Sequence, residues 1–456
     1  RLRRENKQSQ AQMAEAVGVS TAYINLLENN QRSLSVKVLM SVADAYGVDW
    51  RDLIQDNTSR LLADLRTAVQ DPLFDGERPD LQELRSAVDH APVLSEKFLL
   101  LYQNHSSVIE RLMQSGDTLE DGALLTTPET AVHDFFGAHS NYFAELDEAA
   151  EQLREENQCE PDDVYYLLKN RLQKKHDITV GTVGLEEMQR SLRIYRESEG
   201  SIDLSEALDY PNRTFQLAHM LGLIEFKHLI GSLANHLDDT DGSSKVRCQV
   251  ELANYFAAAY LMPYTRFRQA AGTLRYDLDR LCKKFGVSFE QACQRLTTLQ
   301  KKGDRGIPFF FIRVDRAGNV TKRINANSIS IAEHGGACPV WDLHAAFSAP
   351  GTIHPQFVEL PDSTRFFTIS RSVDRPAYSR DFQGRRQAVS LGCDVSHAGE
   401  IGYAQAFRQD DEHLYAKIGI NCRICPRQSC AQRAQNPLTI ELSVNPSIRG
   451  DTRLES

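Results

Sequence analysis

Three cysteines near the C-terminus have the spacing of metal ligands. The sequence there reads Cys422-Arg-Ile-Cys425-Pro-Arg-Gln-Ser-Cys430. Thiolates bind iron–sulfur clusters or zinc, and a Cys-x2-Cys pair with a third Cys five residues later lets one loop wrap a face of such a centre. The pattern therefore predicts a metal site. A [4Fe-4S] cluster is the favoured occupant, and a structural zinc ion is the alternative.

A fourth ligand has to come from another part of the chain. Cys393 follows an apolar run and is the expected fourth ligand, while Cys338, in a Gly-Gly-Ala-Cys-Pro turn, is the possible substitute. Disulfides are the least favoured interpretation, because the composition gives no sign of an oxidising compartment. The cysteines in helical-looking segments are interpreted as small buried apolar residues. These are Cys159, Cys248, Cys282 and Cys293.

Two short helices joined by a glycine turn are the clearest fold signal, and they lie within residues 1–57. Ser9 is expected to cap the first helix, and Gly18 supplies a left-handed turn. Ser20 then caps a second helix whose exposed positions are short and polar. Residues 34–48 are expected to close the bundle. The pattern favours a DNA reader over a bundle used only for protein contacts.

This segment resembles phage-repressor-like (Xre-type) helix-turn-helix domains over its whole length. The resemblance implies that the second helix lies in the major groove, where side chains near its start reach base edges. It also implies that Asn30, Gln31 and Arg32 lie near the DNA backbone. The implied DNA-binding set is Gln10, Ser20, Thr21, Ala22, Tyr23, Asn25 and Arg32.

Residues 58–157 are rich in Leu, Ala, Glu and Gln and are expected to form a helical connector. Long helices are predicted at 94–113 and 130–155, with breaks at 71–76 and 116–128. Amphipathic helices of this kind are explained either by ordinary core packing or by dimerisation. A helix-turn-helix reader usually binds two half-sites about one helical turn apart, so a homo-oligomer, a dimer or a tetramer, is expected.

Residues 158–302 contain two segments that resemble ImmA/IrrE-like zinc peptidase domains, 214–223 and 250–263. In that family a His-Glu-x-x-His helix supplies two zinc ligands and a general base. Here Met220 follows His219, and Leu223 replaces the second histidine. One imidazole cannot hold a catalytic zinc ion, so we expect the fold without the peptidase activity, and no enzyme. A degenerate cleft of this kind suits an effector pocket.

Residues 303–456 read as a sheet-containing sensor domain. A hairpin is predicted from 308–314 and 320–324, which flank a Gly turn. Further strands are predicted at 365–372, 388–392, 402–406 and 416–419, giving an antiparallel sheet with helices. The fold class is therefore multidomain and mainly α, with an α+β C-terminal part.

The composition favours a multidomain protein that works in the cytoplasm without a membrane. The chain has 456 residues, of which 41% are hydrophobic, and no apolar run approaches the roughly 18 residues of a membrane span. The first residues do not read as a signal peptide. The net charge of −10 includes domains that do not contact DNA, so it does not argue against DNA binding. The extreme N-terminus itself is basic.

From Gln10 to about Pro437, ordered motifs resemble one family. It comprises Xre-type regulators of propionate, methylcitrate and glyoxylate metabolism that respond to short-chain fatty acids or acyl-CoA. The family implies an acyl-CoA effector in the central domain and, in some members, a four-iron cluster in the last domain. The motifs are Thr127-Pro128, Asn141-Tyr142-Phe143, residues 335–341, Leu391-Gly-Cys393-Asp, and residues 422–434.

An acyl-CoA effector makes chemical demands on the central domain. Its phosphates require Arg or Lys, its adenine requires an aromatic or guanidinium face, and its short acyl chain requires a narrow apolar slot. We therefore expect a homo-oligomeric transcription factor that couples acyl-CoA, and also redox or iron status, to operator DNA. A metallopeptidase that acts on a regulator is the alternative. Candidate effector contacts beside the motifs are Arg193, Tyr195, Arg213, Phe215, His219, Tyr255, Tyr264 and Arg266.

Overall fold

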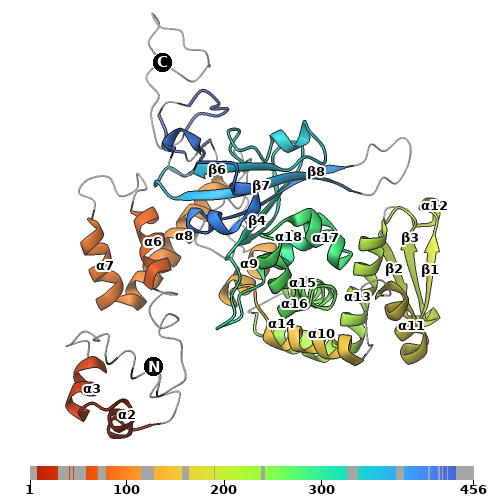
Figure 1. Cartoon of the computed structure of the whole chain (residues 1–456), viewed down its shortest axis with the longest axis horizontal. Coiled ribbons are helices and arrows are strands. Elements are labelled where there is room, and N and C mark those ends of the chain that lie inside the picture. Colours follow the sequence, from red (N-terminus) through yellow and green to blue (C-terminus); the bar gives the residue numbers. More distant parts are fainter. Residues whose placement is uncertain are drawn as a thin grey trace, which may run out of the picture. The chain divides into compact units, whose positions relative to one another are not determined.

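A computed structural model of the chain forms two compact units, residues 1–118 and 119–456. Figure 1 labels most of the helices and strands of both. Each unit is described by itself. The structure describes residues 8–28, 38, 41, 45, 58–69, 79–114, 128–156, 164–188, 191–237, 242–325, 337–375, 385–408, 411–419, 422–423, 425–428 and 430–437.

The first unit begins with the predicted helix pair. The side chain of Ser9 accepts a hydrogen bond from the backbone N–H of Gln12 at the start of α2 (Gln10–Val17), forming a capping box. Gly18 ends this helix in the left-handed conformation, with φ of 73°. Helix α3 (Thr21–Glu28) follows, and the hydroxyl of Ser20 accepts from the N–H of Tyr23. The sequence prediction of these two helices and their caps is confirmed. Residues 34–48 lie largely outside the described residues.

Three further helices of the first unit share a small core. They are α6 (Thr58–Ala68), α7 (Leu81–His90) and α8 (Pro92–Gln114), and their buried residues include Leu65, Leu84 and Leu99. The predicted long helix at 94–113 is confirmed as α8. The predicted break at 71–76 lies outside the described residues, as does the break predicted at 116–128 except for Pro128, which begins the next helix.

The second unit begins with two helices where the sequence predicts one. Helix α9 (Pro128–Ala138) and helix α10 (Ala144–Glu156) are separated by Ser140 and Asn141, both with positive φ. Asn tolerates the left-handed conformation better than most residues, so it suits the turn that breaks the helix. The prediction of an unbroken helix over 130–155 is wrong, because a periodic apolar pattern does not report such a local break.

A small three-stranded sheet accompanies the helices of residues 164–297. Strand β3 (Ser201–Ser205) lies in the centre, parallel to β1 (Thr179–Val183) and antiparallel to β2 (Arg193–Arg196). The sequence pattern did not predict this sheet, whose strands have only four or five residues. The helices are α11 (Val164–His176), α12 (Leu185–Met188), α13 (Tyr210–Glu225), α14 (Lys227–Ala234), α15 (Ser243–Leu261), α16 (Tyr264–Thr273), α17 (Leu278–Phe285) and α18 (Phe289–Thr297).

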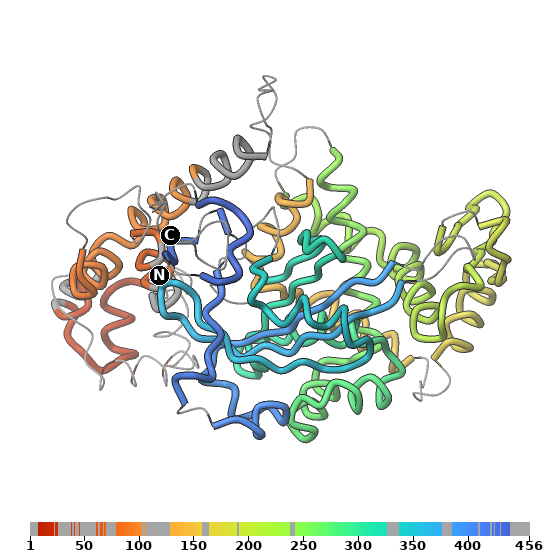
Figure 2. Tube along the Cα trace, turned by 90° about the horizontal axis from the view of Figure 1, so that it is seen from above, coloured from red at the N-terminus to blue at the C-terminus, as the bar shows by residue number. Residues whose placement is uncertain are grey.

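A six-stranded sheet forms the C-terminal part, in the order β5-β4-β8-β7-β6-β9. Its pairs are antiparallel except for β6 with β9, which run parallel, so the sheet is mixed and not purely antiparallel as predicted. Figure 2 traces its strands side by side. The strands are β4 (Phe310–Val314), β5 (Val320–Asn325), β6 (His354–Glu359), β7 (Arg365–Asp374), β8 (Arg386–Asp394) and β9 (Tyr415–Lys417).

Most predicted strands of this part are confirmed, but one is not, and one observed strand was not predicted. The strands at 308–314, 320–324, 365–372 and 388–392 appear as β4, β5, β7 and β8, and that at 416–419 overlaps the short β9. Residues 402–404 form a 3-10 helix instead of a strand, and β6 was not predicted. The 3-10 helices are η3 (Glu197–Glu199), η4 (Ala345–Phe347), η5 (Val395–Glu400), η6 (Gly402–Ala404) and η7 (Glu412–Leu414).

The two faces of this sheet belong to different cores. Because side chains alternate along a strand, Phe309 and Phe311 face the large core shared with the helices, whereas Phe310 and Ile312 face a smaller core. Helix α18 contacts β4 and β5, and α9 contacts β5. The large core extends from Val132 to Tyr415 and so crosses the expected boundaries at 157 and 302.

Candidate functional site: a four-thiol pocket and a large charged cavity

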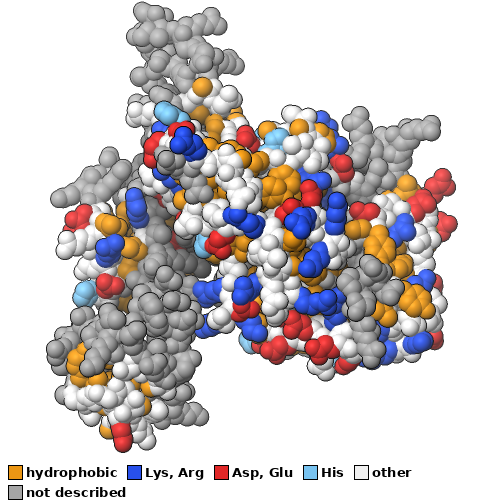
Figure 3. Space-filling model, in the orientation of Figure 1, with side chains coloured by type: hydrophobic (Ala, Val, Ile, Leu, Met, Phe, Trp, Pro, Cys, Tyr) orange, Lys and Arg blue, Asp and Glu red, His pale blue; other side chains and the backbone are white. Residues whose placement is uncertain are grey.

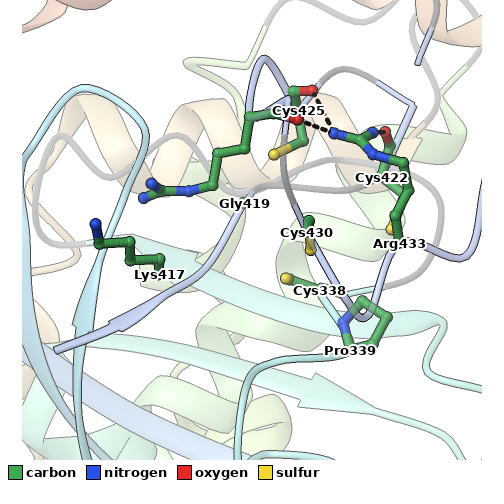
Figure 4. A pocket seen from close by; sticks show the side chains of 9 residues that line it. Cys338, Pro339, Lys417, Gly419, Cys422, Cys425, Cys430 and Arg433 are labelled. Carbon is green, nitrogen blue, oxygen red and sulfur yellow. Dashed lines mark hydrogen bonds between the residues drawn. The ribbon is translucent and has the colours of Figure 1, made fainter. Parts of the chain in front are cut away.

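Four cysteines line one small pocket beside β9. Cys422, Cys425 and Cys430 come from the loop that follows this strand, and Cys338 comes from the segment before η4. All four are free thiols, and Figure 4 shows their sulfur atoms around a common hollow. The structure thus brings together the predicted triplet and the substitute candidate for the fourth position.

The thiol of Cys338 has features of a metal-binding sulfur. Burial raises its pKa, while backbone hydrogen bonds from Gly419 and Val340 act in the opposite direction and favour the thiolate. Cys422 and Cys425 also raise the pKa of Cys338, because two thiolates side by side repel. Backbone N–H groups aimed at a sulfur are one of the means by which a protein tunes an iron–sulfur centre.

A buried arginine holds the cysteine loop in its shape. The guanidinium of Arg433 donates to the carbonyl oxygens of Cys422 (2.9 Å), Cys425 (3.4 Å) and Arg427, as Figure 4 shows for part of this set. The structure gives Arg433 no carboxylate partner among the residues it describes. A buried cation without a carboxylate favours a nearby anion, and the thiolates of the same pocket can provide it.

The donor set of this pocket fits a soft metal centre. Four cysteine thiols form a ligand set that zinc or an iron–sulfur cluster takes, and the buried Arg433 beside them favours their thiolate form. Within the described part of the chain, however, no three His, Cys, Asp or Glu side chains are gathered closely enough to hold a metal ion. A zinc ion requires sulfurs about 2.3 Å from one point, whereas a four-iron cluster takes a wider ring because each sulfur binds a different iron.

Cys393, the expected fourth ligand, lies elsewhere. It is fully buried on β8, on the same face of the sheet as Val389 and Leu391, and belongs to the large core. Burial raises the pKa of its thiol. Cys338 packs in the smaller core on the other face, so the structure does not group Cys393 with the triplet. Of the cysteines interpreted as buried, Cys248 and Cys293 are buried on helices as expected, Cys282 lies on a helix but is only partly buried, and Cys159 is outside the described residues.

A second and much larger cavity lies within unit 119–456. Its volume is about 660 Å³, and it is lined by α9, α15, α18 and the β4–β5 hairpin, with one residue of α13. Ligand sites commonly have about 300–1,000 Å³. Apolar and aromatic side chains form part of the wall. They are Val132, Phe136, Phe215, Val250, Tyr255, Ala258, Val320 and Ile324.

Cations outnumber anions on the wall of this cavity. The amine of Lys322 lies 3.2 Å from Glu251, and the guanidinium of Arg247 lies 3.5 Å from the same carboxylate. Burial raises the pKa of Glu251, but Lys322 and Arg247 outweigh it and hold the pKa below its ordinary value. Arg313 and Arg323 add two more guanidinium groups. Figure 3 shows Lys and Arg side chains gathered over the region of α17 and α18 as well.

A buried ion pair forms the floor of the cavity. Arg295, which is fully buried, is paired with Asp147, and its Nε donates to the carbonyl of Met262 at 3.0 Å. The hydroxyl of Tyr255 donates to Asp147 at 2.5 Å. Arg295 also donates to the hydroxyl of Thr298 at 3.1 Å. Because every member has several partners, this network fixes the floor of the cavity. The wall cations have carboxylate partners too, since Arg313 lies 2.6 Å from Glu290.

Of the eight expected effector contacts, Phe215 and Tyr255 line the large cavity. Arg213 instead donates to the carbonyl of Glu206, and Tyr264 donates to the carbonyl of Asp304. Arg266 is exposed on α16. The remaining three, Arg193, Tyr195 and His219, also do not line the cavity.

The degenerate peptidase site is closed by an arginine. The guanidinium of Arg193 donates to Nδ1 of His219 at 2.9 Å and to the side chain of Gln216 at 3.1 Å. Burial and then the Arg193 charge lower the pKa of His219 to about 4, so the ring is neutral. Burial also lowers the pKa of Arg193, to about 10. The guanidinium of Arg193 therefore engages the nitrogen lone pair of the neutral His219 ring, through which the ring would bind a metal ion. Met220 is buried beside this histidine on α13.

The expected DNA contacts lie partly on an exposed surface. Ser20, Thr21 and Asn25 are exposed, and the amide of Gln10 donates to the side chain of Asn25 at 3.5 Å, so α2 and α3 meet at these side chains. Tyr23 is half-buried. Arg32, Asn30 and Gln31 lie outside the described residues, as does the side chain of Ala22.

Sequence reasoning missed the charged residues of the cavity and, in the thiol pocket, the role of Arg433. The missed residues are Arg247, Glu251, Arg295, Arg313, Lys322, Arg323 and Arg433. One segment of the sequence could have indicated the cavity. It is Val320-Thr-Lys-Arg-Ile324, a predicted strand with polar residues whose partner strand in the hairpin is apolar.

A helix-turn-helix reader joined to a unit with a ligand-sized cavity and a four-thiol pocket defines a DNA-binding transcriptional regulator. Residues 1–53 match the helix-turn-helix family, residues 173–297 the IrrE N-terminal-like domain, and residues 298–453 the family described as short-chain fatty acyl coenzyme A regulator, C-terminal. In the described residues no helix is long and apolar enough to cross a membrane.

Similar proteins align along nearly the whole chain. The propionyl-CoA carboxylase regulator of Cereibacter sphaeroides is 36% identical over 97% of this chain and 94% of its own. The regulators RamB and PrpR of Mycobacterium tuberculosis are 32% and 33% identical over 95% of this chain and over 92% and 90% of their own. These three are named as regulators and not as enzymes. The chain belongs to the family of short-chain fatty acyl coenzyme A regulators.

A solved structure agrees with this assignment. A Mycobacterium tuberculosis transcriptional regulator superposes with a TM-score of 0.68 at 34% identity, covering 73% of this chain and all of that chain. The mainly helical organisation with a C-terminal sheet, predicted from the sequence, is therefore confirmed.

Proposed function

We propose that this chain controls genes of short-chain acyl-CoA metabolism, and that an acyl-CoA bound in the large cavity changes its affinity for operator DNA. The observation that carries this proposal is the wall of the cavity, where several cations face apolar and aromatic side chains in about 660 Å³. A coenzyme A thioester has the matching chemistry, with phosphates at one end and an apolar acyl chain at the other. The names of the relatives support the metabolic setting.

Calorimetry on the full chain tests the ligand. Propionyl-CoA should bind, while free propionate, which lacks phosphates, should not. The operator affinity measured by fluorescence anisotropy should then change with propionyl-CoA, and DNA should change the propionyl-CoA affinity by the same factor, because coupling between two sites is reciprocal. The absence of binding by acetyl-, propionyl- and butyryl-CoA would contradict the proposal.

The thiol pocket supports a second element of the function, a [4Fe-4S] cluster held by Cys338, Cys422, Cys425 and Cys430. When bound, such a cluster supplies a centre that oxidants destroy, so its presence would report redox or iron status. Protein purified without oxygen should then be brown and contain iron. Stoichiometric zinc without iron would leave the same four thiols as a structural site.

Two partner assignments complete the proposal. The protein acts in the cytoplasm, and it binds double-stranded DNA as a homo-oligomer.

An exposed apolar stripe on α8 supports the contact with a second copy of the chain. Val93, Leu94, Leu100 and Leu101 recur there at helical spacing and are exposed at 48% to 71%. Light scattering should show that Leu94→Glu with Leu101→Glu lowers the oligomeric state. Val246→Glu, at an exposed apolar residue of α15, is the matched control.

The alternative function, a metallopeptidase acting on a regulator, is disfavoured by the closed site at His219. The guanidinium of Arg193 fills the ligand position, and Met220 stands where the general base would be. No hydrolysis of a peptide substrate is expected with added zinc.

A further inference from the structure

The β4–β5 hairpin forms part of the wall of the large cavity. Arg313 of β4 and residues 320–324 of β5 all line the cavity. β5 is an edge strand, paired only with β4 in this sheet, and the pairing shifts register between Arg313 and Val314. An edge strand with such an irregularity can adjust its position more easily than a central strand. Any ligand in the cavity therefore touches an adjustable element.

The turn of the same hairpin contacts the segment that carries Cys338. The backbone N–H of Ala337 donates to the carbonyl of Gly318 at 3.1 Å. The ring of His344 lies against Gly318, since a Cβ built on this glycine would be 2.9 Å from His344 Cε1. The same ring lies 3.3 Å from the carbonyl of Ala337 through Nε2. Ala337 and His344, which precede and follow Cys338 in the sequence, therefore both contact the hairpin turn. We call these two contacts the clamp.

The turn itself is rigid. The carboxylate of Asp315 accepts from the backbone N–H groups of Ala317 and Asn319, both at 2.9 Å, and from the side-chain amide of Asn319 at 3.0 Å. Gly318 has a φ of 85°, which favours glycine. A rigid turn passes a displacement of β5 to Ala337 without absorbing it.

We propose that the β4–β5 hairpin couples the large cavity to the thiol pocket, with Gly318 and His344 as the positioning residues for Cys338. The inference rests on the proposed function, because it takes an acyl-CoA as the ligand of the cavity. Occupancy of the cavity changes the accessibility of the Cys338 thiol. Conversely, a ligand bound at this thiol changes the acyl-CoA affinity of the cavity by the factor by which acyl-CoA changes that ligand's affinity, because coupling between two binding sites is reciprocal. The coupling requires no direct contact between the ligand and a sulfur atom.

Cysteine alkylation on the metal-free full chain tests the coupling. The rate at which Cys338 reacts with N-ethylmaleimide is measured by peptide mass spectrometry with and without saturating propionyl-CoA. Cys282 on α17, which is not part of either site, is the internal reference. We expect propionyl-CoA to change the Cys338 rate at least threefold and to leave the Cys282 rate unchanged.

Variants at the clamp separate the coupling from a general structural effect. Gly318→Ala, whose Cβ meets His344, should abolish the ligand dependence of the Cys338 rate while propionyl-CoA still binds. Gly351→Ala is the matched control, because Gly351 has a similar φ of 79° and no atom within 4 Å of an added Cβ. His344→Leu should also abolish the dependence, and His344→Gln, which keeps a donor for the Ala337 carbonyl, should restore part of it.

The outcomes distinguish this inference from the proposed function. If calorimetry finds no binding of propionyl-CoA, both are overturned. If propionyl-CoA binds and the Cys338 rate does not change, the coupling is wrong and the proposed function stands. If Gly318→Ala and Gly351→Ala both keep the ligand dependence, the clamp is not the route of the coupling, and the inference is overturned.

Discussion

Cys338 and Cys393 pack against opposite faces of the six-stranded sheet. Cys393 shares its face of β8 with Val389 and Leu391, in the large core, whereas Cys338 packs with Phe310 in the smaller core. The ligands of one metal centre must lie on the same side of the sheet. Cys338 and Cys393 therefore cannot bind the same centre unless strand β8 is rearranged. The loop that carries Cys422, Cys425 and Cys430 reaches the face of Cys338.

The first prediction concerns these two thiols. Cys338→Ser should lower the iron content of anaerobically purified protein to the level of a Cys422→Ser variant, since one ligand is lost in each. Cys393→Ser should keep the iron but destabilise the fold by about 1–3 kcal/mol, because a hydroxyl is buried among apolar side chains. Iron analysis and urea unfolding measure the two effects.

Cys282→Ser is the control for the general effect of replacing a thiol. It should keep the iron, since Cys282 lies on α17 outside the pocket. Loss of iron in Cys393→Ser with retention in Cys338→Ser would reverse the assignment made here.

The position of Cys393 could have been read from its sequence neighbours. Val389 and Leu391 alternate on the strand predicted at 388–392, and Cys393 continues this alternation one residue beyond it, so the three share one apolar face. The face on which Cys338 lies could not be read, because it precedes η4 in no regular element. The helix pair at the N-terminus was predictable because Ser9, Gly18 and Ser20 act locally, through hydrogen bonds and φ values set within a few residues.

The large cavity could not be predicted for a different reason. Its wall joins Glu251 of α15 to Lys322 of β5, more than seventy positions apart, and to Arg247 one turn away. Motif spacing pointed instead to His219, where the resemblance to ImmA/IrrE-like zinc peptidases implies a metal ligand. Only the packing of α18 and α9 against β4 and β5 brings the wall together.

The second prediction tests the packing of the sheet. A Cβ on Gly392 would lie 2.2 Å from the ring of Phe310, so Gly392→Ala should destabilise the second unit by about 1–3 kcal/mol through overpacking. Gly231→Ala on α14, where an added Cβ meets nothing within 4 Å, should instead stabilise the protein by about 0.5–1 kcal/mol. Chemical denaturation that gave equal effects for the two would contradict this reading of the core.

The third prediction concerns pH and His219. Its pKa of about 4 lies below the ordinary value of 6.5, so the unfolded chain binds the proton more readily than the folded chain. The neutral His219 therefore contributes to the unfolding free energy above pH 6.5, and this contribution is lost as the pH falls from 6.5 towards 4. His219→Gln removes this term, so its unfolding free energy should fall less than that of the wild type over this range. Parallel curves in urea titrations at pH 7, 6 and 5 would show that the histidine does not titrate as stated.

The fourth prediction concerns the DNA reader. Thr21→Ala with Asn25→Ala should abolish sequence-specific binding while the helices remain, because each good base contact contributes about 1–3 kcal/mol of discrimination. Both side chains are exposed on α3. Gln10→Ala alone should weaken binding less, because it removes one expected contact and leaves Thr21 and Asn25 in place. Anisotropy with operator and scrambled DNA measures the preference, and an unchanged ratio between the two would contradict the assignment.

The last prediction concerns the cations of the large cavity. Lys322→Met should weaken propionyl-CoA binding by roughly tenfold or more, since a hydrogen bond to a charged group contributes about 1.5–3 kcal/mol. The loss should shrink at high salt, because the attraction between a cation and a phosphate is screened. Lys301→Met, at an exposed lysine that does not line the cavity, is the matched control and should bind as the wild type does. Loss of Lys322 also removes a partner of Glu251, so Lys322→Met with Glu251→Gln separates the direct effect on the phosphate from repulsion by the freed carboxylate. If the double variant regains wild-type affinity, Lys322 acts only by neutralising Glu251, and the phosphate contact is wrong.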